Sequence, residues 1–592
     1  MSLAPRRRAR LVLLFAAIAL IAGLAGLLSL ARDGARTLVA EQIDHNASAT
    51  ARALAGQIEQ AQRYGIPLDK LPGIEPVFAA LLAERAELAY LVLRSSDGRP
   101  MVHSSRIEDI LPEQAQPLPG HAEATVRLAG GAQISAGYRL DYIDRELGAI
   151  ALDLALALVI AFVLVRELTH GLWVRSALPG LFALALGHVR HIASGTSLTQ
   201  IRLIIFAIAL SEELLRPFFA VFAADLAPVA GLSPAMQAGL PVTAFMLTLA
   251  LAQPLGPWLA QRADLRRALC LAAVAGAALL AVTGWLARDT LTLTLLRGAG
   301  GACYGLTLIL AQTAIVRLTD SGNRARGLAE IAAAIVAAGI VGPAFGGVLA
   351  DRFGYGWAFV GCGAAYLLSA VLALRLPQLA AAASSSRSQY GLAGFLAVLR
   401  EPRARAVILG AAIPARLSAA ALLLLLAPLY LQAQGYPNSM AGRVLMLYFI
   451  TFMLSAPLVA RWSDRYGRRR PFVIAGGLLS VAACAPMPWL DGLGGIALAC
   501  ALLGVGQAVL SAPQMALVAD IFERHPDTDA EQALAAFRLT ERLGSIAAAI
   551  VAARAIDAWG PAGAVGALGA LLGVATVYLW LGLLPYCEKG TP

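Results

Sequence analysis

Long uninterrupted runs of apolar residues constrain this chain more than any other feature of its sequence. A helix needs about 20 apolar residues to cross the hydrocarbon core of a bilayer, and a helix also satisfies its own backbone hydrogen bonds there. The chain has 592 residues, of which 59% are hydrophobic and 14% are charged. That composition is too apolar for a water-exposed surface. The sequence therefore predicts a mainly α-helical, polytopic membrane protein.

About fourteen runs are long enough to span a bilayer. Two stand apart, at about 11–31 and 148–166. The run at 11–31 has no small-residue cleavage site after Leu30, which favours a retained anchor over a cleaved signal peptide. The other twelve runs are 201–226, 237–260, 267–286, 290–316, 327–350, 355–376, 403–432, 440–461, 470–489, 493–519, 530–557 and 560–584.

Arginine collects in alternate loops, which predicts the orientation of the chain. Four arginines precede the first span, so we expect the N-terminus in the cytoplasm and residues 32–147 outside. The later arginine-rich loops then fall inside, while the outside loops 227–236 and 433–439 hold no arginine. The net charge of +10 is thus an orientation signal, and no nucleic-acid partner is expected. We expect a bacterial-type cytoplasmic (inner) membrane protein with both termini in the cytoplasm and residues 32–147 in the periplasm.

These boundaries divide the chain into six parts. They are a cytoplasmic tip and first anchor at 1–31, an external domain at 32–147, a second membrane helix with a juxtamembrane linker at 148–200, a first six-helix half at 201–376, a central cytoplasmic loop at 377–402, and a second six-helix half with the tail at 403–592.

The external segment has no cysteine, so it must fold on its own hydrophobic core. Its apolar periodicity predicts two helices, at about 36–61 and 75–86, followed by strands at 88–93, 100–104, 122–128 and 133–139. Residues 96–99 predict a hairpin turn around Asp97-Gly98. The sequence therefore predicts a small α+β domain.

A long helix that leaves the membrane, strands around an aspartate-glycine turn, and a return through residues 137–144 resemble the single Cache sensor domains of bacterial receptors. The resemblance implies that this domain binds a ligand, of unknown identity, and a purely scaffolding role is the alternative. Within residues 174–195, a helical pattern that Pro179 opens and Gly195 ends resembles the first helix of a HAMP linker. Because Ile201 already begins the next span, an amphipathic helix on the inner membrane face is the favoured interpretation.

Three motifs lie at defined places among the twelve later spans. A cationic loop, with Asp464, Arg465, Gly467, Arg468 and Arg469, has an incomplete copy in the first half around Asp264 and Arg266. The fourth span carries Arg297 and Gly301, and the fifth carries Gly342-Pro343 with Gly346-Gly347. Together they resemble the major facilitator superfamily (MFS) over residues 201–584. The resemblance implies two pseudo-repeated six-helix halves around a central cavity, here with two extra N-terminal helices flanking the external domain.

The motifs imply distinct roles. In the family loop pattern, Asp464 accepts hydrogen bonds from a helix N-terminus or from an arginine across the half, which closes the cytoplasmic side. The first-half copy has Leu265 in place of a basic residue, so we expect Asp464→Asn to impair transport more than Asp264→Asn. The glycine-proline motif in the fifth span marks exporters that exchange substrate against protons, through close helix approach and a kink. Ordinary small-residue packing is the alternative.

Charged residues inside apolar spans are costly and are therefore functional candidates. Glu212 and Arg216 lie one turn apart and are predicted to pair, which leaves Glu213 to face the cavity. The seventh span holds Arg416, and the eleventh holds Arg538, Glu541 and Arg542, with Arg538 and Glu541 on one face. Five arginines, Arg297 included, against three glutamates favour an anionic or zwitterionic substrate. The alternative is internal pairing, with the substrate in contact with an apolar wall.

A carboxylate in an apolar site can bind and release a proton as the site alternates between environments. Glu213 is the first proton-coupling candidate, followed by Glu212 and Glu541. No ATP-type phosphate loop, metal-ligand spacing or enzyme signature is present in the sequence, so we expect no cofactor and no catalysis. The prediction is a proton-coupled exporter of a small anionic, zwitterionic or drug-like molecule, with substrate, protons and the bilayer as partners. The alternatives are a receptor built on a transporter frame, and an MFS importer or facilitator.

Overall fold

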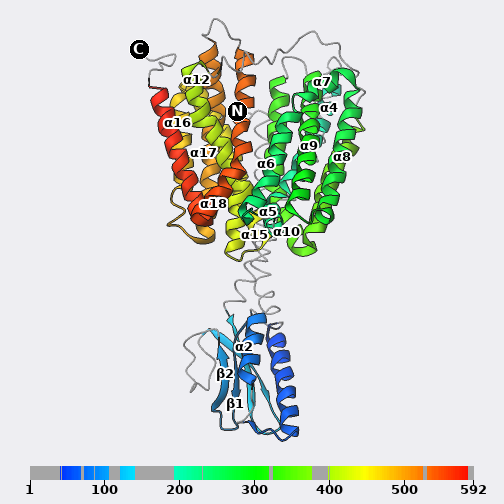
Figure 1. Ribbon diagram of the computed structural model, residues 1–592, viewed down its shortest axis with the longest axis vertical. Coiled ribbons are helices and arrows are strands. Elements are labelled where there is room, and N and C mark those ends of the chain that lie inside the picture. The colour runs from blue at the N-terminus through cyan, green and yellow to red at the C-terminus, as the bar shows by residue number, and fades with distance from the viewer. Residues whose placement is uncertain are drawn as a thin grey trace, which may run out of the picture. The chain divides into compact units, whose positions relative to one another are not determined.

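The computed structural model describes residues 41–140 and 192–584, except 42, 69–72, 86, 106–119, 228, 230, 319–323, 377–397, 399 and 524–529. The chain divides into two compact units, Met1–Leu158 and Val159–Pro592, called unit 1 and unit 2 (Figure 1). The predicted spans at 11–31 and 148–166 lie outside the described residues, as do most of the linker at 148–200 and of the loop at 377–402.

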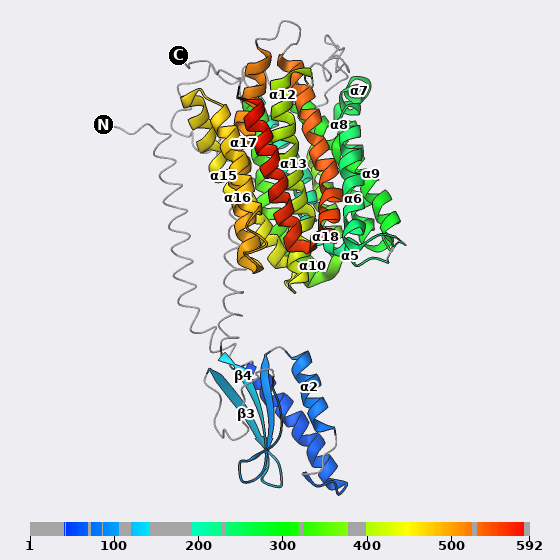
Figure 2. The same cartoon turned by 60° about the vertical axis from the view of Figure 1, so that its left-hand side comes forward.

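Unit 1 contains an antiparallel four-stranded sheet with helices on one face (Figure 2). The strands are β1 (Leu88–Arg94), β2 (Pro100–Ser105), β3 (His121–Arg127) and β4 (Gln133–Arg139), in the order β2-β1-β4-β3. Gly98 and Gly131 adopt φ of 79° and 80° in the two hairpin turns, a conformation that favours glycine. All four predicted strands and the turn at 96–99 are confirmed.

The helix at 43–63 and α2 (Ile74–Glu84) cover this sheet. Ala47, Ala51 and Leu54 recur at helical spacing and pack with Phe78 against sheet residues such as Ile134. These apolar faces form the separate core that the cysteine-free segment requires. The predicted α+β arrangement of this segment is thereby confirmed, and its membership of the Cache family stays a prediction.

The opposite face of the sheet carries a buried polar network. Arg94 donates to both carboxylate oxygens of Glu123, at 3.1 and 3.0 Å, and to Ser135 Oγ at 2.8 Å, while the Tyr90 hydroxyl donates to Glu123 at 2.8 Å. Burial alone would raise the pKa of Glu123, but the hydrogen bonds from Arg94, Tyr90 and Ser135, together with the Arg94 charge, outweigh burial and hold this pKa below its usual value. A Cβ on Gly137 would overlap the Tyr90 ring, so the network requires glycine there.

The described elements of unit 2 are helices, apart from an isolated β-bridge between Ala227 and Asp289. Its first half contains α4 (Ile192–Glu213), α5 (Arg216–Ala224), α6 (Pro234–Ala252), α7 (Leu255–Arg262), α8 (Leu265–Leu286), α9 (Thr290–Leu318) and α10 (Arg324–Ala373). Its second half contains α12 (Pro402–Val407), η4 (Ile408–Ala412), α13 (Ile413–Ala421), η5 (Leu422–Leu426), α14 (Ala427–Ala433), α15 (Asn438–Tyr466), α16 (Arg470–Cys484), α17 (Gly492–Phe522) and α18 (Ala530–Gly582).

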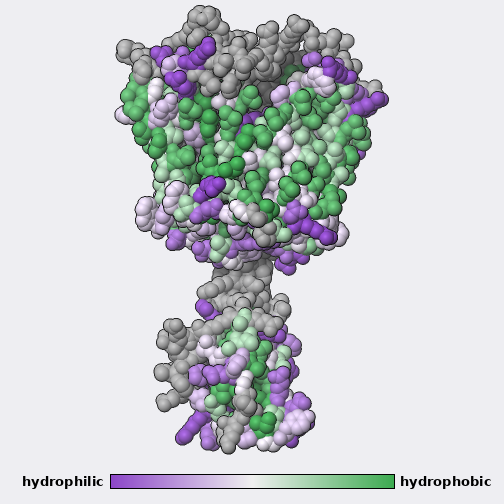
Figure 3. Space-filling view, in the orientation of Figure 1, coloured by the Kyte–Doolittle hydropathy of each residue, from purple (hydrophilic) through white to green (hydrophobic). Residues whose placement is uncertain are grey.

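Eight described helices are long and apolar enough to cross a membrane, and apolar side chains cover the middle of the visible face of unit 2 (Figure 3). Two of them, α10 and α18, contain 50 and 53 residues and each turns at a glycine with positive φ, Gly354 and Gly560. Because about 20 residues suffice for one crossing, each of these is two helices joined at a kink. The count of twelve spans stays a prediction, since α4 carries three charged residues and α16 has 15 residues.

Two helices of unit 2 depart from regular α geometry where proline removes a backbone donor. The first predicted span of the first half is broken at Leu214–Leu215, between α4 and α5, and Pro217 lies at the start of α5. The first predicted span of the second half contains two π-helical turns, η4 and η5, which are followed by Pro414 and Pro428. Broken helices at membrane depth are typical of binding sites, because they leave backbone groups available to a ligand.

Candidate functional site

The two halves of unit 2 contact each other through α10 with α15 and through α6 with α18. Asp351, on α10, accepts from Asn438 N at 3.1 Å and from Ser439 N at 2.7 Å, so it caps the start of α15 in the other half. Asp557, on α18, accepts from Ser233 Oγ at 2.8 Å, at the start of α6. These two contacts are called the latches. In one, a carboxylate of the first half meets a helix start of the second half, and in the other, a carboxylate of the second half meets a helix start of the first half.

The latches also reveal a sequence repeat that the motif search missed. Asp351 precedes Gly354 by three residues and Asp557 precedes Gly560 by three residues. Both glycines have nearly the same conformation, with φ/ψ of 77°/169° and 71°/174°. The two kinks and their carboxylates are therefore equivalent positions in the two halves.

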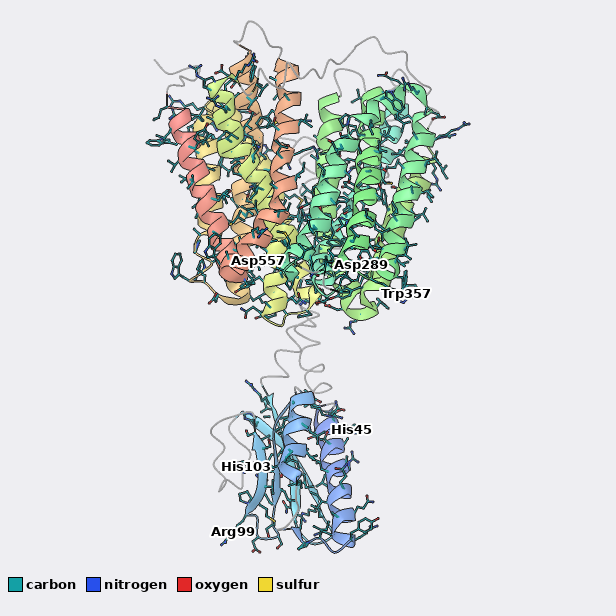
Figure 4. The ribbon with its side chains drawn as sticks, in the orientation of Figure 1. His45, Arg99, His103, Asp289, Trp357 and Asp557 are labelled. Atoms are coloured by element: carbon teal, nitrogen blue, oxygen red, sulfur yellow. The ribbon has the colours of Figure 1, made fainter. Side chains whose placement is uncertain are left out.

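Both latches lie at one end of unit 2. Figure 4 places Asp557 at the same end as Asp289 and Trp357. The ribbons of the two halves diverge toward the other end, where α7 and α12 lie (Figure 1). The predicted charged loops follow α7 and α15, and their arginines include Arg262, Arg266 and Arg465.

The glycine-proline motif forms the contact between α10, the α4–α5 break and α15. A Cβ on Gly342 would overlap Glu213, and a Cβ on Gly346 would overlap the carbonyl oxygen of Leu214. A Cβ on Gly347 would overlap the backbone of Asn438 in the second half. A Cβ on Gly442 of α15 would overlap the carbonyl oxygen of Pro343. The motif thus permits close approach of three helices. α10 continues as helix through Pro343, and its described break lies at Gly354 instead.

The predicted Glu212–Arg216 pair is wrong, because the break at Leu214–Leu215 redirects Arg216. Arg216 instead donates to Glu213 Oε1 at 2.7 Å. Its guanidinium carbon lies 5.4 Å from the ring centroid of Phe449 in the second half. Glu213 is buried and ion-paired at the contact between the halves, which differs from the expectation that it is left free to face the cavity.

Glu212 pairs with Arg297 of α9 instead. Arg297 donates to both oxygens of this carboxylate, at 3.3 and 2.8 Å, and lies between the rings of Phe219 and Phe245. Gly301 and Gly305 follow it on α9, where a Cβ would crowd the backbone of α6 at Phe245 and Leu249. The fourth-span motif therefore anchors α9 to α5 and α6.

In the second half, Arg416 of α13 donates to Glu541 of α18 at 2.8 Å. Glu541 is buried, whereas the Arg416 side chain is 54% exposed and can meet a ligand. Arg538, predicted to lie on the same face as Glu541, forms no ion pair with it. Arg542 is half-buried and Arg538 is exposed.

Several polar residues near these pairs were missed by sequence reasoning. Tyr304 of α9 lies near Glu212, Glu213, Arg216 and Arg542, and Tyr448 of α15 lies near Arg216 and Arg416. Gln507 of α17 donates to the carbonyl of Ala415 at 3.2 Å, beside the irregular part of the seventh span. A tyrosine or glutamine in an apolar run is a weaker signal than a charge, because it tolerates burial better. Among the described residues, no cluster suited to a metal ion is found.

The two charged loops differ from the prediction. Asp264 caps α8, since it accepts from Arg266 N at 2.9 Å, and the Arg266 side chain reaches the carbonyls of Leu374 and Leu376. Asp464 accepts from Arg469, five residues onward, at 2.8 Å, and is exposed. Gly467 ends α15 with φ of 64°, and exposed Arg465 and Arg468 flank it. The first-half aspartate therefore holds a helix N-terminus, and the second-half aspartate holds an arginine of its own loop.

The family follows from a comparison with known families. The model of the Major Facilitator Superfamily matches residues 201–442 and 408–591, which together cover most of the chain. The chain belongs to the Major Facilitator Superfamily. It is thus a multi-pass membrane protein of a transporter family, as predicted, and its relatives of known structure are transporters.

Solved structures of other MFS-like transporters share the fold of unit 2 at low identity. A bacterial homolog of the human lysosomal transporter Spinster, inward-facing and unoccupied, has a TM-score of 0.55 at 15% identity, over 66% of this chain and 96% of that chain. The nucleoside transporter NupG has a TM-score of 0.53 at 14% identity, over 66% and 99%. A POT family transporter in complex with 5-aminolevulinic acid has a TM-score of 0.52 at 13% identity, over 65% and 96%. No curated protein matches the sequence.

Proposed function

We propose that this MFS protein is a proton-coupled exporter of a small organic molecule, working by alternating access between the halves at 201–376 and 403–592. The position of the Glu213–Arg216 pair carries the proposal. The pair lies at the α4–α5 break, Gly342 packs against Glu213, and Arg216 faces Phe449 of the other half. A proton taken up by Glu213 would remove the charge that holds Arg216, at the point where the halves meet.

The direction of opening follows from charge. The diverging end carries the arginine-rich loops, and arginine-rich loops face the cytoplasm. The structure would then be closed by its latches toward the periplasm and open toward the cytoplasm. Export is supported by the glycine-proline motif, and an importer or facilitator remains the alternative.

The proton coupling can be tested without a known substrate. Spin labels at Gln261 and Arg461, exposed residues near the diverging ends of the two halves, report the separation of those ends. In the full-length protein we expect the distance distribution to shift between acidic and alkaline buffer, and Glu213→Gln to abolish the shift. Glu523→Gln, at an exposed helix end, is the matched control and should respond as the wild type does. An undiminished response in Glu213→Gln, Glu212→Gln and Glu541→Gln alike would rule out coupling through this site.

Transport itself needs a second experiment. A deletion strain screened across compound classes for altered sensitivity should identify a compound, whose flux can be measured in proteoliposomes under an imposed pH gradient. Expulsion against its gradient, driven by inward proton flow, is the expected result. Uptake in the same assay would favour the importer.

Unit 1 supports an additional role as an external sensing domain. Its network of Arg94, Glu123 and Tyr90 lies on the sheet face opposite the helices, and a ligand could engage these polar groups by replacing their mutual hydrogen bonds. Deleting residues 32–147 distinguishes the roles. If flux persists but no longer responds to external compounds, the unit is regulatory, and if flux is unchanged in every condition, it is a scaffold. A protein that shows no flux yet still signals would support the receptor alternative.

A further inference from the structure

Three of the five arginines predicted to line the centre of unit 2 have a carboxylate partner. The pairs are Arg216–Glu213, Arg297–Glu212 and Arg416–Glu541. The remaining two, Arg538 and Arg542 of α18, form no hydrogen bond or ion pair with any residue in the described part of the chain. The excess of arginine over glutamate that the sequence predicted for the centre of unit 2 therefore lies on α18.

These two arginines lie one turn apart on a single face of α18. Further along that face, Ala549 packs against Gly239 of α6, so the face is directed at the first half. Leu539 and Leu543, on an adjacent face, are 48% and 51% exposed, as expected for residues that contact lipid. The neighbours of Arg542 are Arg416, Glu541, Tyr304 and Arg538, and Glu541 already has Arg416 as its ion-pair partner. Arg542 therefore points toward the centre of the bundle.

Tyr304 of α9 lies on the side of the first half that packs against α18, because its ring lies 5.7 Å from that of Phe245 of α6 and α6 contacts α18. Its hydroxyl makes no hydrogen bond to any residue that the structure describes. Its charged neighbours are Glu212 and Glu213, which are both ion-paired, and Arg216 and Arg542. A guanidinium with unused N–H donors and an unused hydroxyl donor are thus brought together from opposite halves. A guanidinium without a hydrogen-bonded counter-charge at membrane depth is costly, so a group that supplies one is expected.

On the basis of the proposed transport function, we propose that Arg542 and Tyr304 bind an oxyanion group, a carboxylate or a phosphate, of the transported molecule. The guanidinium presents parallel N–H donors that match two oxygens of such a group, and the Tyr304 hydroxyl donates a third hydrogen bond. Arg538, one turn away and exposed, attracts the anion toward this site. Organic cations are disfavoured by like charge. A ligand held by both halves also links binding to their separation.

The test uses four probes that share one aromatic body and differ in charge. They are 3-phenylpropionate, 3-phenylpropyl phosphate, 3-phenylpropanol and 3-phenylpropylamine. The thermal midpoint of the purified full-length protein is measured against the concentration of each probe. We expect at least one anion to raise the midpoint, and the alcohol and amine to leave it unchanged. The anion that acts more strongly identifies the group as carboxylate or phosphate.

Variants connect the effect to the residues. Arg542→Gln should weaken apparent anion affinity by about tenfold or more, and Tyr304→Phe by several-fold, because each removes a hydrogen bond to a charged group. Arg554→Gln, an exposed arginine on the same helix, is the control and should bind as the wild type does. If Arg542→Gln does not fold, Arg542→Lys keeps the charge, loses the paired donors and should show an intermediate loss.

Three results would overturn the proposal: stabilisation by the amine equal to that by the anions, wild-type affinity in Arg542→Gln, or no stabilisation by either anion. The measurement needs no pH gradient, so it is independent of proton coupling. Loss of the pH response in Glu213→Gln with retained anion binding would support both proposals separately. Anion binding without any pH response in the wild type would contradict the coupling alone.

Discussion

Arg297 shows how a charge can be stabilised inside an apolar bundle. It donates to both oxygens of Glu212, and its guanidinium carbon lies 4.8 Å from the Phe219 ring centroid and 4.1 Å from that of Phe245. A planar cation satisfies both kinds of contact, whereas an ammonium satisfies them poorly. With 6% of its surface exposed, Arg297 acts as a positioning residue for α5, α6 and α9.

Replacing one member of this pair should cost more than replacing both. We expect Arg297→Gln to lower the free energy of unfolding by roughly 3–5 kcal/mol, because it leaves Glu212 buried without a partner. The double variant Glu212→Gln with Arg297→Gln should lose less than the sum of the single changes. Thermal unfolding of the purified variants measures both. Strictly additive losses would show that the two side chains act independently.

In unit 1, the carboxylate of Glu123 makes stability depend on pH. Since its pKa is held below the usual value in the folded state, its contribution is present above the usual carboxylate range and is lost as pH falls through the lowered pKa. We expect the protection factors of β1 and β4 amides in the full-length protein, which correct hydrogen exchange for its intrinsic pH dependence, to fall in acid. Glu123→Gln should lower these protection factors already at neutral pH and flatten their acid dependence. Unchanged acid dependence in that variant would assign the effect to another group.

At the scale of elements, glycines decide how closely the helices approach. Gly346 meets the Leu214 carbonyl at the α4–α5 break, whereas Gly300 on α9 has nothing within 4 Å of an added Cβ. The two glycines therefore allow a matched comparison between a tightly packed helix position and an open one.

We expect Gly346→Ala to destabilise unit 2 by about 1–3 kcal/mol, because backbone rather than a movable side chain occupies the space. Gly300→Ala should be neutral or stabilising by up to about 1 kcal/mol, since it lowers the flexibility of an open helix position. Thermal midpoints compare the two directly. Equal effects would mean that the close approach at Gly346 relaxes without cost.

Local patterns predicted the elements of unit 1 because each strand and turn is specified by its own residues. The strands at 88–93 and 133–139, and the turn at Asp97-Gly98, lie where periodicity and turn chemistry placed them. The Glu212–Arg216 pairing failed for a physical reason: the spacing rule assumes a continuous helix, and Pro217 removes the donor that would have continued it. Proline within an apolar run was the available signal.

At the scale of the whole molecule, contacts between the halves were beyond sequence reasoning. Asp351 and Asp557 each meet a helix start far away in the chain. Under the proposed alternating access, such contacts would exist in one state of the protein and not in the other. The incomplete motif around Asp264 likewise forms a helix cap that was not predicted from its sequence.

Removing either latch charge should favour opening at the latched end. We expect Asp351→Asn and Asp557→Asn each to increase the reactivity of a cysteine introduced at Ser439, whose backbone N–H rather than its side chain forms the latch, with a larger effect in the double variant. Asp289→Asn is the control, because Asp289 lies at the same end and accepts from Thr292 of its own half at 2.8 Å (Figure 4). Equal reactivity in all variants would show that glycine packing alone keeps this end closed.

The hydrogen bond from Tyr138 to Asp44, at 3.1 Å, joins the beginning of the first helix of unit 1 to the end of its last strand. Asp44 also helps to raise the pKa of Tyr138, after burial itself, to about 12. The first described helix and the last strand of this unit thus have neighbouring ends, as in domains that tolerate being inserted or excised. We expect a few flexible residues in place of 45–137 to join these two ends, so that this part of unit 1 can be replaced without separating Asp44 from Tyr138.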